Sequence, residues 1–268
     1  MNTINSFGDL DLFFEKYFLK NTLTNNYVLA ETYHQLIDDG KLFYYETSGN
    51  VFLLVEKESF YQLYFFINNL NETVNLLTNK PITMEIVFRG PANKPLDLIG
   101  FWERNEFKEH LTRDNLSLTY GKLKQIDLNN TSVQLKYADT EKEVHLIKEL
   151  FEDSLDQYTG DLMSINEIKS FINNKNIICA YIDNRFCGAL QFEVKNNIIW
   201  LGHIATDLNF RGNGIASHLV KKYIDDNTIG DNSRYQLWVI NDNIAAKSLY
   251  TKFGFIYTNK STTSLLKL

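Results

Sequence analysis

The segment from residue 198 to 226 constrains the fold of this chain more than any other. Its first part, 198–206, is apolar and partly β-branched and predicts a strand, which a loop containing Arg211-Gly212-Asn213-Gly214 follows. Apolar residues then recur at i, i+4, i+5, i+8 and i+9, at Ile215, Leu219, Val220, Tyr223 and Ile224. This spacing predicts a helix over 214–226 with one buried face, so a strand, a glycine-rich turn and a helix follow each other.

The loop before this helix has the composition of an anion-binding turn. Gly212 and Gly214 allow a tight turn and a close approach of the backbone to a ligand. The first N–H groups of a helix have no partner within the helix, so they can bind a phosphate or pyrophosphate, and Arg211 adds a cation. The loop is neither a P-loop nor a dinucleotide-binding G-x-G-x-x-G motif. Taken alone, it is also compatible with a turn that only begins an amphipathic helix.

A second segment, 237–255, has the sequence LWVINDNIAAKSLYTKFGF. Together the two segments resemble the GNAT superfamily of N-acetyltransferases, whose R/Q-x-x-G-x-G/A motif is matched by Arg211, Gly214 and Ala216. The later pattern N-x-x-A-x-x-L-Y-x-K-x-G-F is matched by Asn243, Ala246, Leu249, Tyr250, Lys252, Gly254 and Phe255. The resemblance covers about residues 132–268. It implies an acyl-CoA N-acyltransferase with acetyl-CoA as cosubstrate and no metal.

The resemblance also assigns roles to individual residues. The loop amides would hold the pyrophosphate of coenzyme A, and the strand at 204–206 would pair with the pantetheine arm through main-chain groups. The amide of Thr206 or its neighbour would polarise the thioester carbonyl, and Asn243 would bind the pantetheine. The expected coenzyme-binding residues are Ile204, Ala205, Thr206, Arg211, Gly212, Asn213, Gly214, Ile215, Ala216 and Asn243.

Three further side chains are candidates for chemistry or for binding of the acceptor. The resemblance places Tyr250 beside the sulfur, where a phenol can protonate the departing thiolate, although a tyrosine here can also simply pack at the core edge. His203 could accept the amine proton, but strict alternation turns it away from Gly202 and Ile204 unless a bulge intervenes. Tyr158, in the DQYTGDL turn, is a candidate for the acceptor pocket or a plain surface residue.

The chain is long enough for two domains, which we expect at 1–128 and 132–268 with a polar linker at 128–132. The expected class is α/β, with a mixed, mostly antiparallel GNAT-type sheet flanked by helices in two tandem domains. In the first half, IGFWERNEF at 99–107 overlays KSLYTKFGF at 247–255, with Trp102 in the place of Tyr250. This half is therefore interpreted as a degenerate GNAT-like domain without coenzyme binding; the alternative is an unrelated α/β domain.

Local patterns predict the individual elements. In the first half we expect helices at 10–20, 25–39, 70–78 and 95–104, and strands within 42–66, at 82–88 and as a pair within 107–121. In the second half we expect strands at 133–137, 177–182, 188–194, 198–206, 235–239 and 254–268, and helices at 140–154, 164–173, 214–226 and 243–252. A two-residue turn at Asp183-Asn184 would set Cys187 opposite Ala180, so no disulfide with Cys179 is expected.

Composition limits the partners. With 27 Lys+Arg and 33 Asp+Glu the net charge is −6, which argues against nucleic acid or an anionic membrane as partner and mildly favours a cationic acceptor. Two cysteines and no signal-like start favour the cytoplasm. The acceptor is expected to be a small amine, an amino acid or a peptide amine. Two alternatives stay open: a non-catalytic acyl-CoA-binding sensor or scaffold, and an enzyme that uses a longer acyl donor.

Overall fold

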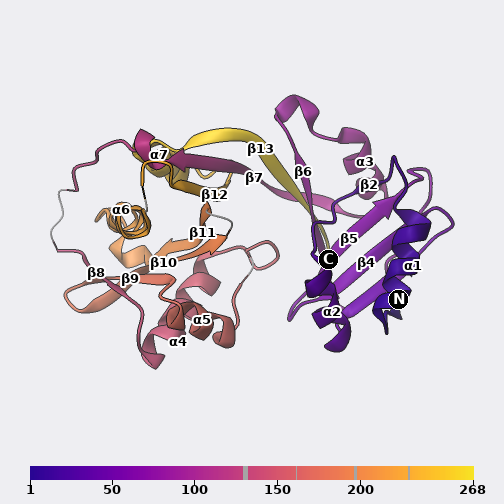
Figure 1. Cartoon of the computed structure of the whole chain (residues 1–268), viewed down its shortest axis with the longest axis horizontal. Coiled ribbons are helices and arrows are strands. Elements are labelled where there is room, and N and C mark those ends of the chain that lie inside the picture. Colours follow the sequence, from indigo (N-terminus) through magenta and orange to yellow (C-terminus); the bar gives the residue numbers. More distant parts are fainter. Residues whose placement is uncertain (129–131, 161, 196–197, 229) are drawn as a thin grey trace. The chain divides into compact units, whose positions relative to one another are not determined.

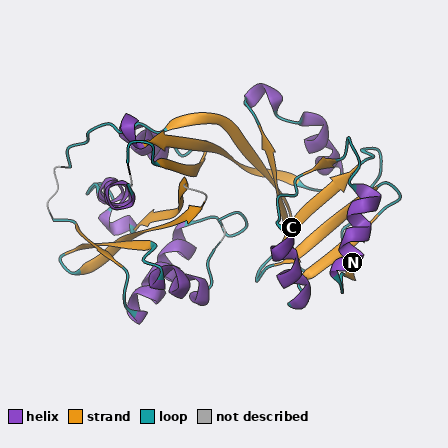
Figure 2. Ribbon diagram, viewed as in Figure 1, coloured by secondary structure: helices purple, strands orange, loops and turns teal. Residues whose placement is uncertain are grey.

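The computed structural model describes residues 1–268 except 129–131, 161, 196–197 and 229. The chain forms two compact units: residues 1–112 with 260–268, and residues 113–259. Both are α/β units in which helices flank a mixed sheet (Figures 1 and 2). Most of the expected linker at 128–132 lies outside the described residues.

The first unit has a sheet with the strand order β1-β3-β4-β5-β6-β13. Its elements are β1 (Asn2–Thr3), α1 (Phe7–Tyr17), β2 (Leu23–Thr24), α2 (Ala30–Asp38), β3 (Leu42–Glu46), β4 (Asn50–Glu56), β5 (Tyr61–Ile67), β6 (Ile82–Phe88), α3 (Leu96–Arg104) and the first residues of β7 (Lys108–Thr119). The last strand, β13 (Ile256–Lys267), pairs antiparallel with β6, Ser261 opposite Phe88. One face of the sheet packs against α1 and α2 and the other against α3.

The second unit has the strand order β7-β12-β11-β10-β9-β8. Its elements are β8 (Gln134–Tyr137), α4 (Glu141–Ser154), α5 (Ile165–Asn173), β9 (Ile177–Ile182), β10 (Arg185–Lys195), β11 (Ile198–Thr206), α6 (Ile215–Asn227), β12 (Arg234–Ile240) and α7 (Ile244–Phe253). Figure 1 shows α4 and α5 on one face of this sheet and α6 on the other. Each face has its own apolar cluster.

Local sequence explains where the helices of the second unit begin and end. Thr140 and Ser164 form capping boxes at the starts of α4 and α5, each with a glutamate three residues on. Asn243 caps α7 by accepting a hydrogen bond from the Ala246 N–H at 3.0 Å. The helix ends at Gly254, whose φ of +99° suits glycine, and a Cβ there would lie 2.8 Å from the Lys122 carbonyl oxygen. These signals are local, which is why the expected helices were found.

Three features differ from the sequence expectations. Residues 70–78 do not form a helix: Val74 and Leu76 are buried, and the Val74 N–H donates to Asn105 Oδ1 at 2.7 Å, so tertiary contacts hold the segment in an irregular conformation. The expected pair of strands within 107–121 is the single strand β7. In the β9–β10 hairpin, Cys187 is bulged out of the register and Gly188 lies opposite Ala180.

The boundaries of the two compact units, at residues 112/113 and 259/260, also differ from the linker expected at 128–132. Residues 113–119 of β7 pair with β12 in the second unit, and residues 261–267 of β13 pair with β6 in the first unit. Each unit therefore completes its sheet with a strand from the other half of the sequence.

Candidate functional site

The parallel strands β11 and β12 pair only over their first residues. The ladder runs from Ile198 opposite Arg234 to Leu201 opposite Leu237, although β11 continues to Thr206 and β12 to Ile240. On its other edge β11 pairs with β10 along its whole length. Residues 202–206 of β11 thus keep one edge that β12 does not cover, which we call the open edge. Its main-chain groups could pair with an extended ligand, and Ile204, Ala205 and Thr206 of the expected pantetheine site lie on it.

A bulge at Gly202 sets the direction of the side chains on the open edge. Phe192 of β10 lies opposite Leu201 and Gln191 lies opposite His203, so Gly202 is the extra residue. A side chain there would collide with Gln191, whose Oε1 would lie 2.0 Å from a Cβ. From the sequence, the face on which His203 lies depended on whether the strand contains a bulge, and the structure has one.

Because of the bulge, His203 lies on the face that carries α4 and α5. Leu201 and Ile204 both join the cluster under α6, whereas Ala205 joins the cluster under α4 and α5. The His203 ring meets Phe151 of α4 edge-on, with centroids 5.4 Å apart. The half-buried imidazole therefore lies on the opposite side of the sheet from α6 and next to the open edge. A base in this position could receive a proton from an acceptor amine bound beside the edge.

The loop between β11 and α6 presents backbone amides at the start of a long helix. Gly214 is the N-cap of α6 in a left-handed conformation, with φ +73°, and no side chain caps the helix. Gly212 also has a positive φ, +85°, and a Cβ there would have no neighbour within 4 Å. Arg211, Gly212, Asn213 and Gly214 are all exposed, whereas Ile215 is buried as the anchor of the helix. A pyrophosphate would therefore meet the first backbone N–H groups of α6, the positive end of the helix dipole and a guanidinium.

Three contacts hold the loop in this shape. Asn213 donates through Nδ2 to the Phe210 carbonyl at 3.0 Å, and the Asp207 N–H donates to the carbonyl of the bulged Cys187 at 3.0 Å. The Arg185 guanidinium lies over the Phe210 ring, 5.0 Å from its centroid. The loop is thus tied to the β9–β10 hairpin, and its amides need little reorganisation on binding an anion.

Helix α7 carries the other predicted residues. Asn243 is exposed, and its Oδ1 caps the helix, which leaves the Nδ2 amide as the group with which it could bind pantetheine. Tyr250 lies two turns further on and is 3% exposed, in the cluster that also holds Phe255, whose ring centroid is 5.7 Å away. Burial raises the pKa of the Tyr250 phenol, so this group is protonated at neutral pH. It can donate a proton but is a poor base.

Tyr158 lies in a tightly tied turn between α4 and α5. Asp156 Oδ1 accepts from the N–H groups of Tyr158 and Thr159 and from the Thr159 hydroxyl, at 3.1, 2.9 and 2.8 Å. Arg113 of β7 donates through Nη2 to the Thr159 carbonyl and to its hydroxyl, the latter at 2.7 Å. The half-buried Tyr158 is therefore held on a turn of fixed shape.

Two side chains of β7, Asp114 and Arg113, make polar contacts that were not predicted from the sequence. Asp114 of β7 accepts from Lys247 Nζ and from Asn241 Nδ2, both at 2.7 Å, and its side chain is mostly buried. Because Asp114 and Lys247 are 133 residues apart in the chain, no local signal joins them. The same is true of Arg113 and Thr159, which only the pairing of β7 with β12 brings together.

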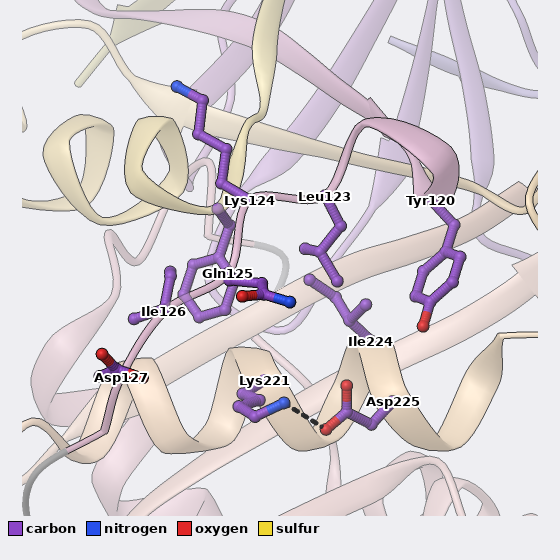
Figure 3. A pocket seen from close by; sticks show the side chains of 10 residues that line it. Tyr120, Leu123, Lys124, Gln125, Ile126, Asp127, Lys221, Ile224 and Asp225 are labelled. Carbon is purple, nitrogen blue, oxygen red and sulfur yellow. Dashed lines mark hydrogen bonds and ion pairs between the residues drawn. The ribbon is translucent and has the colours of Figure 1, made fainter.

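A cavity of about 340 Å³ lies elsewhere in the second unit (Figure 3). Its walls are the segment 120–127, Phe253 and the later turns of α6, where Lys221 and Asp225 form an ion pair of 2.8 Å. None of the predicted site residues lines it, and it does not include the N-terminus of α6. We therefore place the candidate site at the open edge of β11 and not in this cavity.

Outside the omitted positions, no group of three or more His, Cys, Asp or Glu side chains is arranged to hold a metal ion. No helix in the described part of the chain combines the length and apolarity needed to cross a membrane.

The fold and site define a class: an α/β domain in which a parallel pair of strands diverges beside a helix with a glycine-rich N-terminal loop. Residues 144–255 match the family model described as "Acetyltransferase (GNAT) family". The second unit thus contains a domain of the GNAT acetyltransferase family, a family of acyltransferases. The likeness expected from the two sequence motifs is confirmed.

Solved structures extend the likeness of fold to most of the chain. A GCN5-related N-acetyltransferase from Sphaerobacter thermophilus is 10% identical, with a TM-score of 0.58 over 87% of this chain and 84% of that one. A GNAT-family acetyltransferase from Colwellia psychrerythraea is 11% identical, with a TM-score of 0.54 over 100% and 99%. A tandem GNAT protein of the clavulanic acid biosynthesis pathway is 10% identical, with a TM-score of 0.53 over 82% and 80%. No curated protein matches the chain in sequence. The first unit is thus also GNAT-like in fold.

Proposed function

We propose that this protein transfers an acetyl group from acetyl-CoA to a primary amine, by direct attack of the amine on the thioester. The observation that carries the proposal is the combination of the open edge of β11 with the uncapped N-terminus of α6. The first offers main-chain groups to a pantetheine arm, and the second offers amides and Arg211 to the pyrophosphate. The coenzyme would lie along residues 204–206 and end in the loop at 211–216.

The chemical step is a single displacement. The amine nitrogen attacks the thioester carbonyl carbon, a C–N bond forms and the C–S bond breaks. Main-chain N–H groups of the open edge, that of Thr206 or its neighbour, stabilise the oxyanion that develops. The amine proton passes to His203, directly or through water, and the thiolate takes a proton from Tyr250. Both side chains then return to their starting protonation state by exchange with solvent.

The environment of each group suits its role. Tyr250 stays protonated because burial raises the pKa of its phenol, and it lies in α7 beside the divergent strands. His203 lies on the face of α4 and α5, so the base and the acid would act from different sides of the thioester. An alkylamine is mostly protonated at neutral pH, so a neighbouring base raises the reactive fraction. No covalent enzyme intermediate is required, and burial raises the pKa of the Cys187 thiol to about 11, which disfavours a thiolate nucleophile.

The decisive experiment is acetyl-CoA turnover, followed by release of free thiol, with a panel of amines. The panel contains putrescine, lysine ethyl ester, free amino acids and short peptides with free N-termini. Amine-dependent thiol release with formation of the acetylated amine supports the proposal. Binding of acetyl-CoA without turnover on any amine would favour the alternative of a sensor or scaffold. A parallel series of acyl-CoA thioesters would test the choice of a longer donor.

A further inference from the structure

Arg113 joins two parts of the second unit that flank the open edge. It lies opposite Ile240, the last residue of β12, and its guanidinium reaches across to Thr159 in the turn after α4. In the last turn of α4, just before that segment, Phe151 contacts the His203 ring of β11. The segment from Phe151 to Thr159 thus runs from β11 to the neighbour of β12, past the gap where the two strands diverge.

The turn is built to keep one shape. Asp156 accepts three hydrogen bonds from Tyr158 and Thr159. Gly160 is buried, its N–H donates to the Asp156 carbonyl at 2.6 Å, and a Cβ there would lie 2.2 Å from that oxygen. Asp156 orders the turn internally, and Arg113 fixes it to the sheet through both the carbonyl and the hydroxyl of Thr159.

We propose that Arg113 is a positioning residue that sets the wall of the acceptor pocket by holding the Tyr158 turn across the gap between β11 and β12. The inference rests on the proposed function. Arg113 lies outside residues 144–255 and reaches the site only through the pairing of β7 with β12. The first half of the chain would thereby contribute to the selection of the acceptor.

The test compares Arg113→Ala and Arg113→Lys with Arg234→Ala, an exposed arginine of β12 that serves as control. Steady-state kinetics with the best amine of the panel should show KM for the amine raised about 10-fold or more in Arg113→Ala. The affinity for acetyl-CoA and the melting temperature should stay near wild type, and Arg113→Lys should recover part of the loss, since an ammonium keeps a donor for the Thr159 carbonyl.

Hydrogen exchange of the Tyr158 and Thr159 amides provides a readout that needs no substrate. It should accelerate in Arg113→Ala and in Thr159→Val and not in Arg234→Ala. Unchanged exchange and unchanged KM would overturn the proposal. Faster exchange in a protein that acetylates no amine would contradict the proposed function and leave the anchoring of the turn standing, so the two failures are distinguishable.

A second inference comes independently from the first unit, whose strands repeat the divergence. The parallel ladder between β5 and β6 contains only the pairs Tyr61–Ile82 and Gln62–Thr83. On its other edge β5 pairs with β4 from Tyr61 to Ile67. Residues 63–67 of β5 therefore have an edge that β6 does not cover, in the place that corresponds to the open edge of β11.

In the first unit this edge is taken by the chain itself. The short strand β2 pairs with it, Leu23 opposite Ile67 and Thr24 opposite Phe66. Asn25 then bridges the divergent strands: Nδ2 donates to the carbonyls of Leu63 in β5 and Glu85 in β6, at 3.0 and 3.1 Å, and Oδ1 accepts from the Phe65 N–H at 2.8 Å. An asparagine amide thus makes the kind of contacts that a pantetheine arm would make with a strand edge.

We propose that residues 23–25 are an internal ligand that permanently fills the coenzyme cleft of the first unit, so that the chain has one acyl-CoA site. The connection from β5 to β6 agrees with this, because residues 68–81, all described, contain no helix in the place of α6. Trp102 is fully buried in the core of this unit, where it packs against Phe52, Phe65 and Phe107.

Calorimetric titration with coenzyme A tests the stoichiometry. Wild type should bind one equivalent, and Gly214→Glu, which blocks the site in the second unit, should bind none. A second equivalent in wild type, or one equivalent left in Gly214→Glu, would overturn the proposal. This measurement needs no change in the first unit, so it does not depend on the folding of a variant there.

The contacts of Asn25 are tested by Asn25→Ala, with the exposed Asn71→Ala as control. Loss of the bridge should accelerate hydrogen exchange at the Phe65 amide at least 10-fold and lower the melting temperature by several degrees. The control should change neither quantity. If Asn25→Ala behaves like Asn71→Ala, the bridge does not hold the cleft closed and the proposal is wrong.

Discussion

Leu201 and Leu237 form the last pair of the parallel ladder between β11 and β12. One residue further, the bulge at Gly202 changes which face each following side chain of β11 occupies. The same point in the strand therefore ends the pairing with β12 and turns His203 toward α4. The open edge and the position of the candidate base therefore have one structural origin, and the predictions below follow from it and from the groups around it.

Replacement of Gly214 by glutamate is expected to abolish coenzyme binding. The residue is the left-handed N-cap of α6, so a side chain adds backbone strain, and a carboxylate repels a pyrophosphate at the same helix end. Calorimetry should show no binding of acetyl-CoA at concentrations up to about 100 times the wild-type Kd. Gly40→Glu is the matched control, because Gly40 also has a positive φ, +65°, with open space around it. Equal affinity in Gly214→Glu and wild type would remove the loop from the coenzyme site.

Tyr250→Phe should lower kcat by ~10²–10⁴ while coenzyme binding survives, since general acid catalysis is typically of that size. The phenylalanine ring keeps the buried packing against Phe255, so the melting temperature should change little. The loss should shrink at high pH, where a thiolate leaves without a proton. Wild-type turnover at neutral pH in the variant would reduce Tyr250 to a packing residue.

His203→Gln should lower kcat/KM for the amine by about 10²-fold, because a side-chain amide cannot accept the amine proton. His145→Gln serves as control: this histidine is exposed on α4, away from the strand edge. Wild-type kcat/KM in His203→Gln would show that water or another side chain accepts the proton.

Glu143 should make the stability of the second unit depend on pH. It is 2% exposed at the start of α4. Burial alone would raise the pKa of its carboxyl, but hydrogen bonds from the Asp139 backbone, Tyr181, Thr140 and Lys136 outweigh burial and lower the pKa to about 2. The folded pKa lies below the ordinary 4.5, so this stabilisation is present above pH ~4.5 and is lost as the pH falls toward 2.

The size of that contribution is at most ~3 kcal/mol at neutral pH. Glu143→Gln should therefore lower the free energy of unfolding by about 2–3 kcal/mol at pH 7 and by roughly half of that at pH 3. Urea denaturation at the two pH values measures the difference. Glu149→Gln, on the exposed face of the same helix, is the control. An equal loss at both pH values would mean that packing, and not the charge, accounts for the effect.

Local patterns in the sequence predicted much of this fold and the parts of the site that lie close together in the chain. The loop at 211–216, the helix after it and the helix expected at 243–252 are each encoded in consecutive residues, and the structure has both helices within one residue of the expected bounds. The expected register of the β9–β10 hairpin was wrong by one residue: a bulge at Cys187, which has no signature in the sequence, places Gly188 and not Cys187 opposite Ala180. The helix expected at 70–78 was wrong because Asn105, far along the chain, takes the Val74 N–H.

The contacts that the sequence did not predict all join distant segments. Arg113 meets Thr159, Lys247 meets Asp114, and Asn25 meets both Leu63 and Glu85. Each contact could be predicted only once the strand order was known. A strand order in which β7 neighbours β12 has no signature in the local sequence. The bulge at Gly202 was partly predictable. The sequence indicated that the orientation of His203 depends on a bulge, but only the register with β10 shows that the bulge is present.

The placement of residues 261–267 beside β6 has a consequence for biosynthesis. A ribosome makes the whole of residues 113–259 after β6 and before this strand, which takes on the order of 10 s at typical elongation rates. During that time the edge of β6 that β13 will cover stays unpaired, and unpaired edges invite association between nascent chains. The first unit thus begins to emerge before the second unit but is completed after it, because its strand β13 is translated only after the second unit.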